Sequence, residues 1–413
     1  MSTIEGYEPR SAALRELVAR GFVEQCSDAA AIDEALAAGP VTFYIGYDPT
    51  APSLHVGNLV CIMAMRRLQA FGHRPIVVLG SGTARIGDPS GKSEMRRMLD
   101  EPTIERHVAR IAAHFDSYLD MSRGLALDNW SWLGKLGWLE VLRDIGPHFT
   151  VNRMIAVKTY RERLDAEEPL SFLEFNYQLL QAYDFARLYR EHGCTLQLGG
   201  SDQWGNIIAG VELVRRLGLG KAGAAHCLTF PLLTTADGKK MGKTEKGAVW
   251  LASDMCSTFD YYQFWISCDD RDVRRLLGTF TDLPLDEIAE LCKAEGAALR
   301  DVKARLAFEA TKLRDGEAAA EQARAAAKQA FGGGDDWSAV PEVQVDGAPM
   351  KLVDLVVHAS IAAFKSKREA RERIEGGGVR LDGTPITAPD HMVGAGMVRL
   401  QAGKKLRLRV TLV

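Results

Sequence analysis

The sequence lacks any run of about 18 consecutive apolar residues, so we expect no membrane-spanning helix. The segment from Met1 to Arg20 lacks the basic start and apolar middle of a signal peptide. None of the seven cysteines belongs to a C-x-x-C pair, which argues against a structural zinc site. We therefore expect a cytoplasmic protein with free thiols and without a bound metal or tightly bound cofactor.

The length and the distribution of charge predict several domains. The 413 residues exceed what one hydrophobic core usually holds. The net charge is −3, yet Met350 to Val413 carries twelve Lys and Arg against six Asp and Glu, which is typical of a basic nucleic-acid-binding module on an acidic body. Gly332 to Asp336 is the clearest linker. We predict a catalytic domain at 1–250, a helical domain at 251–331, a linker at 332–349 and a basic domain at 350–413.

The first domain shows two strand–helix–strand patterns. β-branched and aromatic runs alternate with helically spaced apolar residues, and glycines separate them. The patterns fall at 41–48, 57–71 and 75–79, and again at 195–200, 203–217 and 227–233. We therefore predict an α/β fold with a doubly wound, Rossmann-like parallel sheet. A mostly helical insertion is expected at about 100–190, and continuous helices are expected from Phe259 to Phe331.

Two loops have the chemistry of a phosphate site. Residues 48–58 (DPTAPSLHVGN) join a strand to a helix, where free N–H groups and the helix dipole favour an anion. Residues 237–245 (DGKKMGKTE) place lysines in a glycine-rich loop that could close over a polyphosphate. Taken alone, either loop fits an ordinary solvated turn better than a phosphate site.

Together, the two loops resemble the paired signatures of the class I aminoacyl-tRNA synthetases. His55-Val56-Gly57-Asn58 is similar to the first signature, with Asn58 in place of its second histidine. Lys240-Met241-Gly242-Lys243-Thr244 is similar to the second, with Gly242 and Thr244 in place of two serines. Three further stretches, at 44–58, 176–185 and 196–207, resemble the bacterial tyrosine–tRNA ligases, and the likeness extends over about the whole chain.

This resemblance implies an enzyme that activates L-tyrosine with ATP and then transfers it to the 3′ end of tRNA(Tyr). The implied tyrosine-binding residues are Tyr44 and Asp184 at the phenol, and Tyr177, Gln181, Asp88 and Gln203 at the other end. Independently of the family, Tyr177, Gln181 and Asp184 have the spacing of one helix face. That spacing also fits an amphipathic helix with a polar outer face.

The same resemblance implies the ATP site and the catalytic groups. ATP would lie against Gly46, Asp48, His55, Gly57, Asn58, Gly200, Asp202 and Lys243. Charge on the departing pyrophosphate would be stabilised by Thr50, His55, Lys92, Arg96, Lys240, Lys243 and Thr244. Mg²⁺ would accompany the phosphates, and a homodimer is expected from the family.

The basic domain resembles an S4-type RNA-binding module of the α+β class. Ser366 and Glu369 form a capping box for a helix that carries Lys367, Arg368, Arg371 and Arg373. Asp382-Gly383 predicts a hairpin. Lys405, Arg407 and Arg409 alternate with apolar residues, so one strand face should be basic and could contact tRNA phosphates, unless it is only a solvated charged face.

Three other functions are alternatives to that of a tyrosine–tRNA ligase. A tryptophan–tRNA ligase shares the architecture, but Tyr44 together with Asp184 favours a hydroxyl-bearing ligand. A small-molecule nucleotidylyltransferase would need neither the second lysine loop nor an RNA module. An inactive RNA-binding homologue is disfavoured by the presence of Lys240, Lys243, His55 and Asp202.

Overall fold

The computed structural model describes residues 4, 6–89, 99–221, 223–244, 247–331, 337, 340–403 and 406–413. By internal contacts the chain forms two compact units, Met1–Glu317 and Ala318–Val413. None of the helices within these described ranges is long and apolar enough to cross a membrane.

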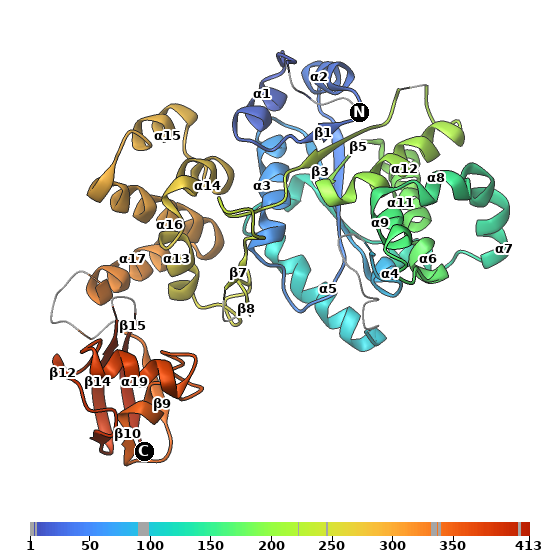
Figure 1. Cartoon of the computed structure of the whole chain (residues 1–413). Coiled ribbons are helices and arrows are strands. Elements are labelled where there is room, and N and C mark those ends of the chain that lie inside the picture. The colour runs from blue at the N-terminus through green and yellow to red at the C-terminus, as the bar shows by residue number, and fades with distance from the viewer. Residues whose placement is uncertain are drawn as a thin grey trace. The chain divides into compact units, whose positions relative to one another are not determined.

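The first unit is built on a six-stranded sheet (Figure 1). Four neighbouring strand pairs are parallel, and only the edge strand β1 is antiparallel to its neighbour. In spatial order the strands are β1 (Gln25–Cys26), β6 (His226–Phe230), β5 (Cys194–Gly200), β2 (Thr42–Tyr47), β3 (Arg74–Leu79) and β4 (Leu125–Asp128). The predicted doubly wound parallel sheet is confirmed. Strand β4 was not predicted, and it lies inside the segment that we expected to be helical.

Helices cover both faces of this sheet (Figure 1). One face carries α3 (Val56–Ala70), which begins directly after the His55 signature. The other carries α11 (Tyr177–His192) and α12 (Trp204–Arg216). Alternation along β2 explains the two layers, because Tyr44 packs with Phe185 of α11 while Phe43 and Ile45 are buried on the opposite side. These elements confirm the predicted strand–helix–strand patterns.

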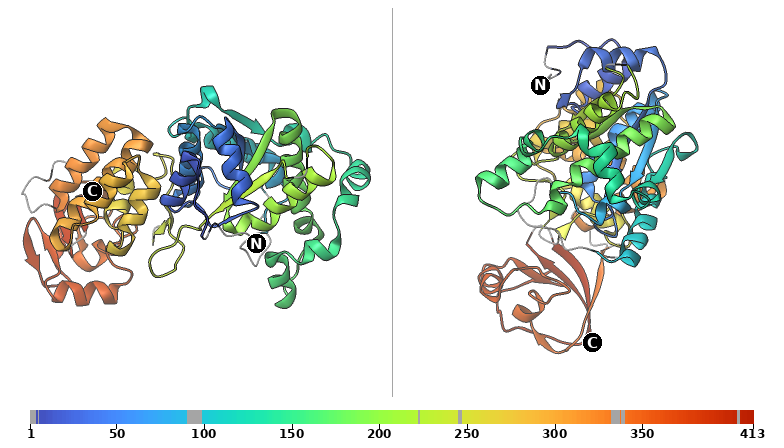
Figure 2. Two further views of the ribbon diagram at one scale, coloured as in Figure 1. Left: turned by 90° about the horizontal axis from the view of Figure 1, so that it is seen from above. Right: turned by 90° about the vertical axis from the view of Figure 1, so that its right-hand side faces the viewer.

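Further helices complete the first unit. Those near the N-terminus are α1 (Ala12–Ala19), α2 (Ala29–Ala38), α4 (Ser81–Ala84) and α5 (Glu101–Phe115). The insertion holds α6 (Trp130–Leu133), α7 (Trp138–Glu140), α8 (Val151–Ile155), α9 (Lys158–Asp165) and α10 (Phe172–Phe175). In Figures 1 and 2 the green helices α7, α8 and α9 project beyond the sheet. The helical region that follows contains α13 (Thr258–Ile266), α14 (Val273–Phe280), α15 (Leu285–Leu291) and α16 (Leu299–Asp315).

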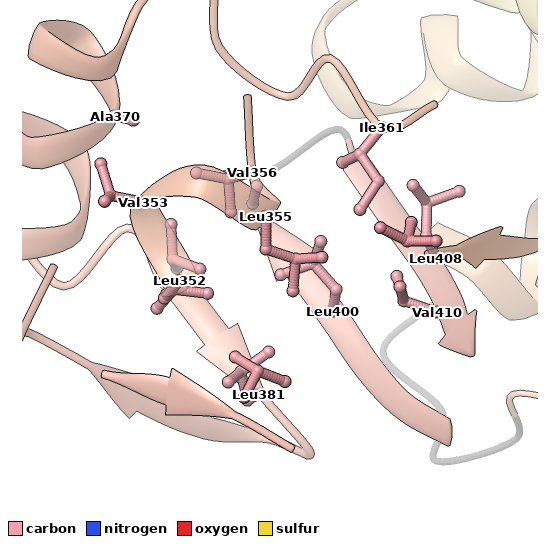
Figure 3. Close-up of a cluster of buried hydrophobic side chains, with 14 of the residues drawn as sticks. Leu352, Val353, Leu355, Val356, Ile361, Ala370, Leu381, Leu400, Leu408 and Val410 are labelled. Atoms are coloured by element: carbon pink, nitrogen blue, oxygen red, sulfur yellow. The ribbon is translucent and has the colours of Figure 1, made fainter. Parts of the chain in front are cut away.

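The second unit begins with α17 (Glu317–Phe331) and continues as an α+β domain. Its five-stranded sheet has the spatial order β12 (Thr384–Ile386), β11 (Val379–Leu381), β14 (Gly396–Ala402), β15 (Leu406–Leu412) and β9 (Glu342–Val345). Strands β10 (Met350–Lys351) and β13 (Met392–Val393) pair separately, and the helices are α18 (Leu352–Leu355) and α19 (Lys367–Glu375). The core gathers Leu352, Leu355, Leu400 and Val410 between α18 and the sheet (Figure 3).

Local predictions for this unit are confirmed. Ser366 caps α19, accepting the Glu369 N–H at 3.2 Å. Asp382 and Gly383 have φ angles of 48° and 83° and connect β11 to β12 as a hairpin. The unit boundary after Glu317 differs from our boundary at 331, so α17 groups with the C-terminal residues.

The predicted alternation of basic and apolar residues along β15 is present, and its two described arginines are partly exposed. Arg407 lies 4.9 Å from the Trp337 ring centroid and donates to the Gln329 carbonyl at 3.2 Å. Arg409 donates to the Val340 carbonyl and pairs with Glu342 at 3.3 Å. Contacts with the preceding segment therefore cover these side chains only in part. Lys405 lies outside the described residues.

Candidate active site

The candidate site lies where the winding of the sheet reverses. Strands β2 and β5 are neighbours, with Tyr44 opposite Gln197, but the chain leaves them toward opposite edges of the sheet. The carboxyl ends of two such strands form the usual ligand-binding crevice of a doubly wound sheet. Asp48 follows the end of β2, and Ser201 and Asp202 follow the end of β5. Both belong to stretches that the sequence singled out.

The first signature forms the N-terminus of α3. The Asn58 side chain accepts the His55 backbone N–H at 3.1 Å and so caps the helix. A Cβ atom on Gly57 would lie 2.7 Å from Cε1 of His55, so only glycine lets the imidazole occupy this place. Asn58 therefore organises the helix start, and its predicted contact with ATP stays a prediction.

The second signature lies against the first. A Cβ on Gly242, whose φ is +96°, would lie 3.1 Å from the backbone nitrogen of Gly57. Residue Val249 connects the two, because its N–H donates to the Gly242 carbonyl and its carbonyl accepts the Val56 N–H, both at 2.9 Å. Lys240 is exposed beside this junction. The two signature loops are therefore neighbours in the fold.

Some predicted groups are described only partly. Lys243 and Thr244 form β7 (Lys243–Thr244), which pairs with β8 (Gly247–Ala248), but their side chains lie outside the described residues. Lys92 and Arg96 also lie outside them. Thr50 is exposed, and its backbone N–H donates to the Asp48 carbonyl at 2.8 Å.

The turn after β5 suits a polar ligand. A Cβ on Gly200 would lie 2.7 Å from Oδ1 of Asp202, so the carboxylate folds over the glycine. Loss of hydration and the negative charge of Asp88 raise the pKa of Asp202, while Lys240 acts in the opposite direction. A Cβ on Gly46 would meet no atom of the described structure within 4 Å, which leaves space over β2.

Tyr44 and Asp184 are both buried, and they lie close enough for the negative charge of Asp184 to help raise the pKa of Tyr44. The exposed fractions are 1% for Tyr44 and 4% for Asp184. The Tyr44 hydroxyl finds no hydrogen-bond partner within the described part of the chain. Burial raises the pKa of Asp184 to about 7, although hydrogen bonds from Asn129 and Trp132 oppose that shift.

A chain of buried hydrogen bonds runs from this carboxylate to Tyr177. Asp184 accepts from Nδ2 of Asn129 at 2.9 Å and from Nε1 of Trp132 at 2.7 Å. Asn129 also donates to Thr83 Oγ1 at 3.1 Å, and Thr83 donates to Asp48 at 2.6 Å. Tyr177 donates to the other Asp48 oxygen at 2.9 Å.

Asn129, Trp132 and Thr83 were not among the predicted site residues. The one local signal was a polar residue directly after a short apolar run, Leu125 to Leu127, which would have had to be recognised as a strand. Tyr177 and Asp184, seven positions apart on α11, thus meet two ends of one network.

The second polar group surrounds Asp88, which accepts from Nε2 of Gln203 at 2.6 Å. Asn206, one turn further along α12, approaches Asp88 and Gln203 at 3.5 and 3.2 Å. Gln181 is half-buried on α11. The structure thus joins the predicted Asp88 and Gln203 and adds Asn206, which the sequence analysis did not select.

Comparisons with known proteins agree with this geometry. Residues 36–332 match the family described as tRNA synthetases class I (W and Y), and residues 335–398 match the tyrosine–tRNA ligase SYY-like C-terminal domain. The chain is 50% identical to a tyrosine–tRNA ligase from Zymomonas mobilis, with 96% of this chain and 97% of that protein covered. A second tyrosine–tRNA ligase, from Methylocella silvestris, is 46% identical over 99% of this chain and all of the relative.

Among solved structures, a C-terminally truncated mitochondrial tyrosyl-tRNA synthetase from Aspergillus nidulans is similar, with a TM-score of 0.70 and 30% identity. The likeness covers 79% of this chain and 96% of the truncated one. A tryptophanyl-tRNA synthetase from Aeropyrum pernix shares the fold, with a TM-score of 0.54 and 15% identity over 77% of this chain and 91% of that one.

Proposed function

The chain belongs to the class I tRNA synthetases and, among them, to the tyrosine–tRNA ligases, and from that premise we propose how its own residues select and activate tyrosine. The enzyme uses ATP to activate tyrosine and then joins it to tRNA. The observation that carries the residue assignment is the buried pair of Tyr44 and Asp184 at the switch point of the sheet.

We propose that the substrate's phenolic hydroxyl lies between Tyr44 and Asp184. Asp184 already accepts two hydrogen bonds, and a carboxylate has further lone pairs for a third donor. The Tyr44 hydroxyl can donate to or accept from the same phenol. Phenylalanine would leave the buried Tyr44 hydroxyl without a partner and would give Asp184 no third donor, which costs free energy. Selection of tyrosine then follows from hydrogen bonding, and size alone would not provide it.

The ammonium group is proposed to lie among Tyr177, Gln181 and Asp88, with Gln203 alongside. Gln203 holds Asp88 in place through the 2.6 Å hydrogen bond. Asp48 accepts from the Tyr177 hydroxyl, so this phenol is already oriented before the substrate arrives. Two ends of the substrate are thus bound by groups fixed to a rigid scaffold, which places its carboxylate for reaction.

The tyrosine carboxylate is proposed to attack the α-phosphate of ATP, and the bond from that phosphorus to the pyrophosphate oxygen breaks. No protein nucleophile is required, so the protein contributes position and charge. Gly46, Gly57, Gly200 and Asp202 would accommodate the nucleoside and phosphates, and His55 at the start of α3 would face the departing charge. Thr50, Lys92, Arg96, Lys240, Lys243 and Thr244 complete the proposed set, with Mg²⁺ entering on the ATP phosphates as part of the substrate.

Amino-acid-dependent exchange between pyrophosphate and ATP tests this proposal. Of the twenty amino acids, tyrosine alone is expected to support exchange, because only it places a hydroxyl between Tyr44 and Asp184. Exchange of similar rate with phenylalanine or tryptophan would contradict the assignment of these two residues.

The affinity for tyrosine is expected to depend on pH around neutrality. Protonated Asp184 offers one acceptor fewer, because the oxygen that carries the proton would face the Asn129 or Trp132 donor. Since burial raises the pKa of Asp184 to about 7, tyrosine should bind about tenfold more tightly at pH 8 than at pH 6. Calorimetry at both pH values measures this, and equal affinities would show that ionisation of Asp184 does not control binding.

A homodimer is proposed, with the insertion as its interface. Large apolar side chains are exposed along this segment, namely Trp138 53%, Leu139 78%, Leu142 47%, Val151 61%, Ile155 37%, Leu164 48% and Phe172 68%. Such a concentration on projecting helices is typical of a covered surface, and a second copy of the chain is the partner that the family implies.

Replacing Phe172 by glutamate is therefore expected to give monomers, because it would bury a charge in an apolar interface. Sedimentation velocity measures the change. Met397 is 58% exposed but lies in the second unit, so Met397→Glu is a matched control that should leave the dimer intact. A dimeric Phe172→Glu protein would place the interface elsewhere.

Binding of tRNA is assigned to the second unit, and we propose the cytoplasm, where tRNA is charged, as the site of action. Helix α19 carries the exposed Lys367, Arg368, Arg371 and Arg373. Lys367 pairs with Asp354 and Arg368 with Glu372. The α19 side chains are the main proposed phosphate contacts because they are exposed, whereas Arg407 and Arg409 are only partly exposed.

A further inference from the structure

The end of α16 holds a buried arginine that lies outside the site described above. The Arg314 side chain is 3% exposed and pairs with Asp315, which is 12% exposed. Its guanidinium lies 4.0 Å from the Tyr261 ring centroid. A buried guanidinium needs partners for its donors, and their identity shows what the residue holds in place.

Two of those partners are main-chain carbonyls at the two ends of one irregular segment. Arg314 Nη1 donates to the Trp250 carbonyl at 3.3 Å and to the Cys256 carbonyl at 3.0 Å. The segment between them connects β8, beside the second signature, to α13. One side chain on a long helix therefore fixes where this connection begins and ends.

The start of this segment also joins the two ATP signatures. Leu251 donates to the Leu54 carbonyl at 2.8 Å, and Val249 bonds to both Val56 and Gly242. The rings of Trp250 and His55 are 6.2 Å apart. Residues 249–251 are thus a short bridge between the His55 loop and the Lys240 loop.

We infer that Arg314 is a positioning residue for the ATP site and acts through the 249–251 bridge. It touches neither substrate. By holding the Trp250 carbonyl, it sets the distance between His55 and the second signature. The forked guanidinium reaches two carbonyls and the Asp315 carboxylate together, which a lysine cannot do. The tyrosine network of Asp48, Asn129 and Asp184 does not include this bridge.

Other groups hold the same segment. Ala252 donates to Ser53 Oγ at 3.0 Å, and Asp254 pairs with Arg110 at 2.8 Å. The Arg110–Asp254 pair is 42% and 64% exposed, so it is screened by water and should contribute little. Asp254→Asn is therefore a matched control on the same segment.

The test compares wild-type enzyme with Arg314→Gln, Arg314→Lys and Asp254→Asn at a temperature where all four are folded. The KM for ATP is measured by tyrosine-dependent pyrophosphate exchange, and the Kd for tyrosine by calorimetry without ATP. Arg314→Gln should raise the KM for ATP at least about tenfold while the Kd for tyrosine changes less than about twofold. The KM for ATP of Arg314→Lys should lie between the values of the wild type and Arg314→Gln. Asp254→Asn should have the wild-type KM for ATP and Kd for tyrosine.

A wild-type KM for ATP in Arg314→Gln would overturn the inference, even if that variant melted at a lower temperature. Parallel loss of tyrosine and ATP binding would also overturn it, because that pattern indicates general loosening. If Arg314→Gln does not fold, Arg314→Lys is the variant that tests the inference. An unchanged KM for ATP in Arg314→Lys would then overturn the inference. The inference about Arg314 rests on the proposed ATP site, but the experiment distinguishes the two. Absence of tyrosine-dependent exchange in the wild type would contradict the proposed function itself.

Discussion

Replacing Asp184 by asparagine is expected to weaken tyrosine binding by about 3 kcal/mol, or about hundredfold in Kd. Both oxygens of Asp184 are already acceptors, one for Asn129 and the other for Trp132. An amide at this position would therefore place its NH₂ group against another N–H donor. Asn129 cannot turn over to relieve this contact, because its own oxygen accepts the Gly82 N–H at 2.8 Å. The substrate's phenol would meet a poorer acceptor in a rearranged site.

Isothermal calorimetry with tyrosine measures this effect, and the neighbouring carboxylate supplies the control. Asp128 uses the same oxygen to accept from Ser81 and from the Trp130 N–H, so Asp128→Asn keeps a suitable acceptor. It should bind tyrosine within about threefold of wild type. If Asp184→Asn also bound tyrosine normally, Asp184 would have to be removed from the proposed site.

A chain that ends at Glu317 is expected to form tyrosyl-adenylate and yet charge tRNA at least about a hundredfold more slowly. The residues proposed for tyrosine and ATP all lie in the first unit, Met1–Glu317. The exposed cations of α19 lie in the second unit, and losing them removes most of the proposed phosphate contacts. The truncated Aspergillus nidulans relative, which covers 79% of this chain, was solved as a folded protein without its C-terminal part.

The cut position also tests where α17 belongs. A chain that ends at Phe331 keeps α17, whose Ala320, Ala323 and Ala327 are buried in the intact protein. Because α17 groups with the C-terminal residues, we expect the longer fragment, which lacks them, to be the less soluble of the two. Pyrophosphate exchange and tRNA charging are compared for both fragments and the whole chain. Undiminished charging by the Glu317 fragment would show that the second unit is not the main tRNA contact.

The structure contains the local features that short sequence patterns predicted. His55 and Gly57 are found together because the imidazole needs a position without a side chain two residues away. The Ser366 cap and the Asp382-Gly383 hairpin depend on neighbours within a few positions. Tyr177 and Asp184 share a helix, so their spacing already put them on one face.

Residues that act across the sheet could not be found in this way. Asn129 joins Asp184 to Thr83 only because β4 pairs with β3, and four residues of mixed exposure gave too weak a strand pattern to predict. Arg407 and Arg409 alternate with buried residues as predicted, but their contacts with Trp337 and Glu342 come from outside the strand and could not be predicted. No sequence motif indicated a role for Arg314.

Resemblance in the sequence identified the family, and residue types at short, regular spacing were enough to predict the doubly wound sheet and to locate the two signature loops. The tertiary structure alone decided that Val249 bridges these loops, that a buried chain of hydrogen bonds links Asp184 to Tyr177, and that Arg314 holds the bridge from a distant helix. The reason is physical. A hydrogen bond between side chains more than 50 positions apart requires both backbones to be fixed by sheet pairing and helix packing, and no local spacing encodes that distance.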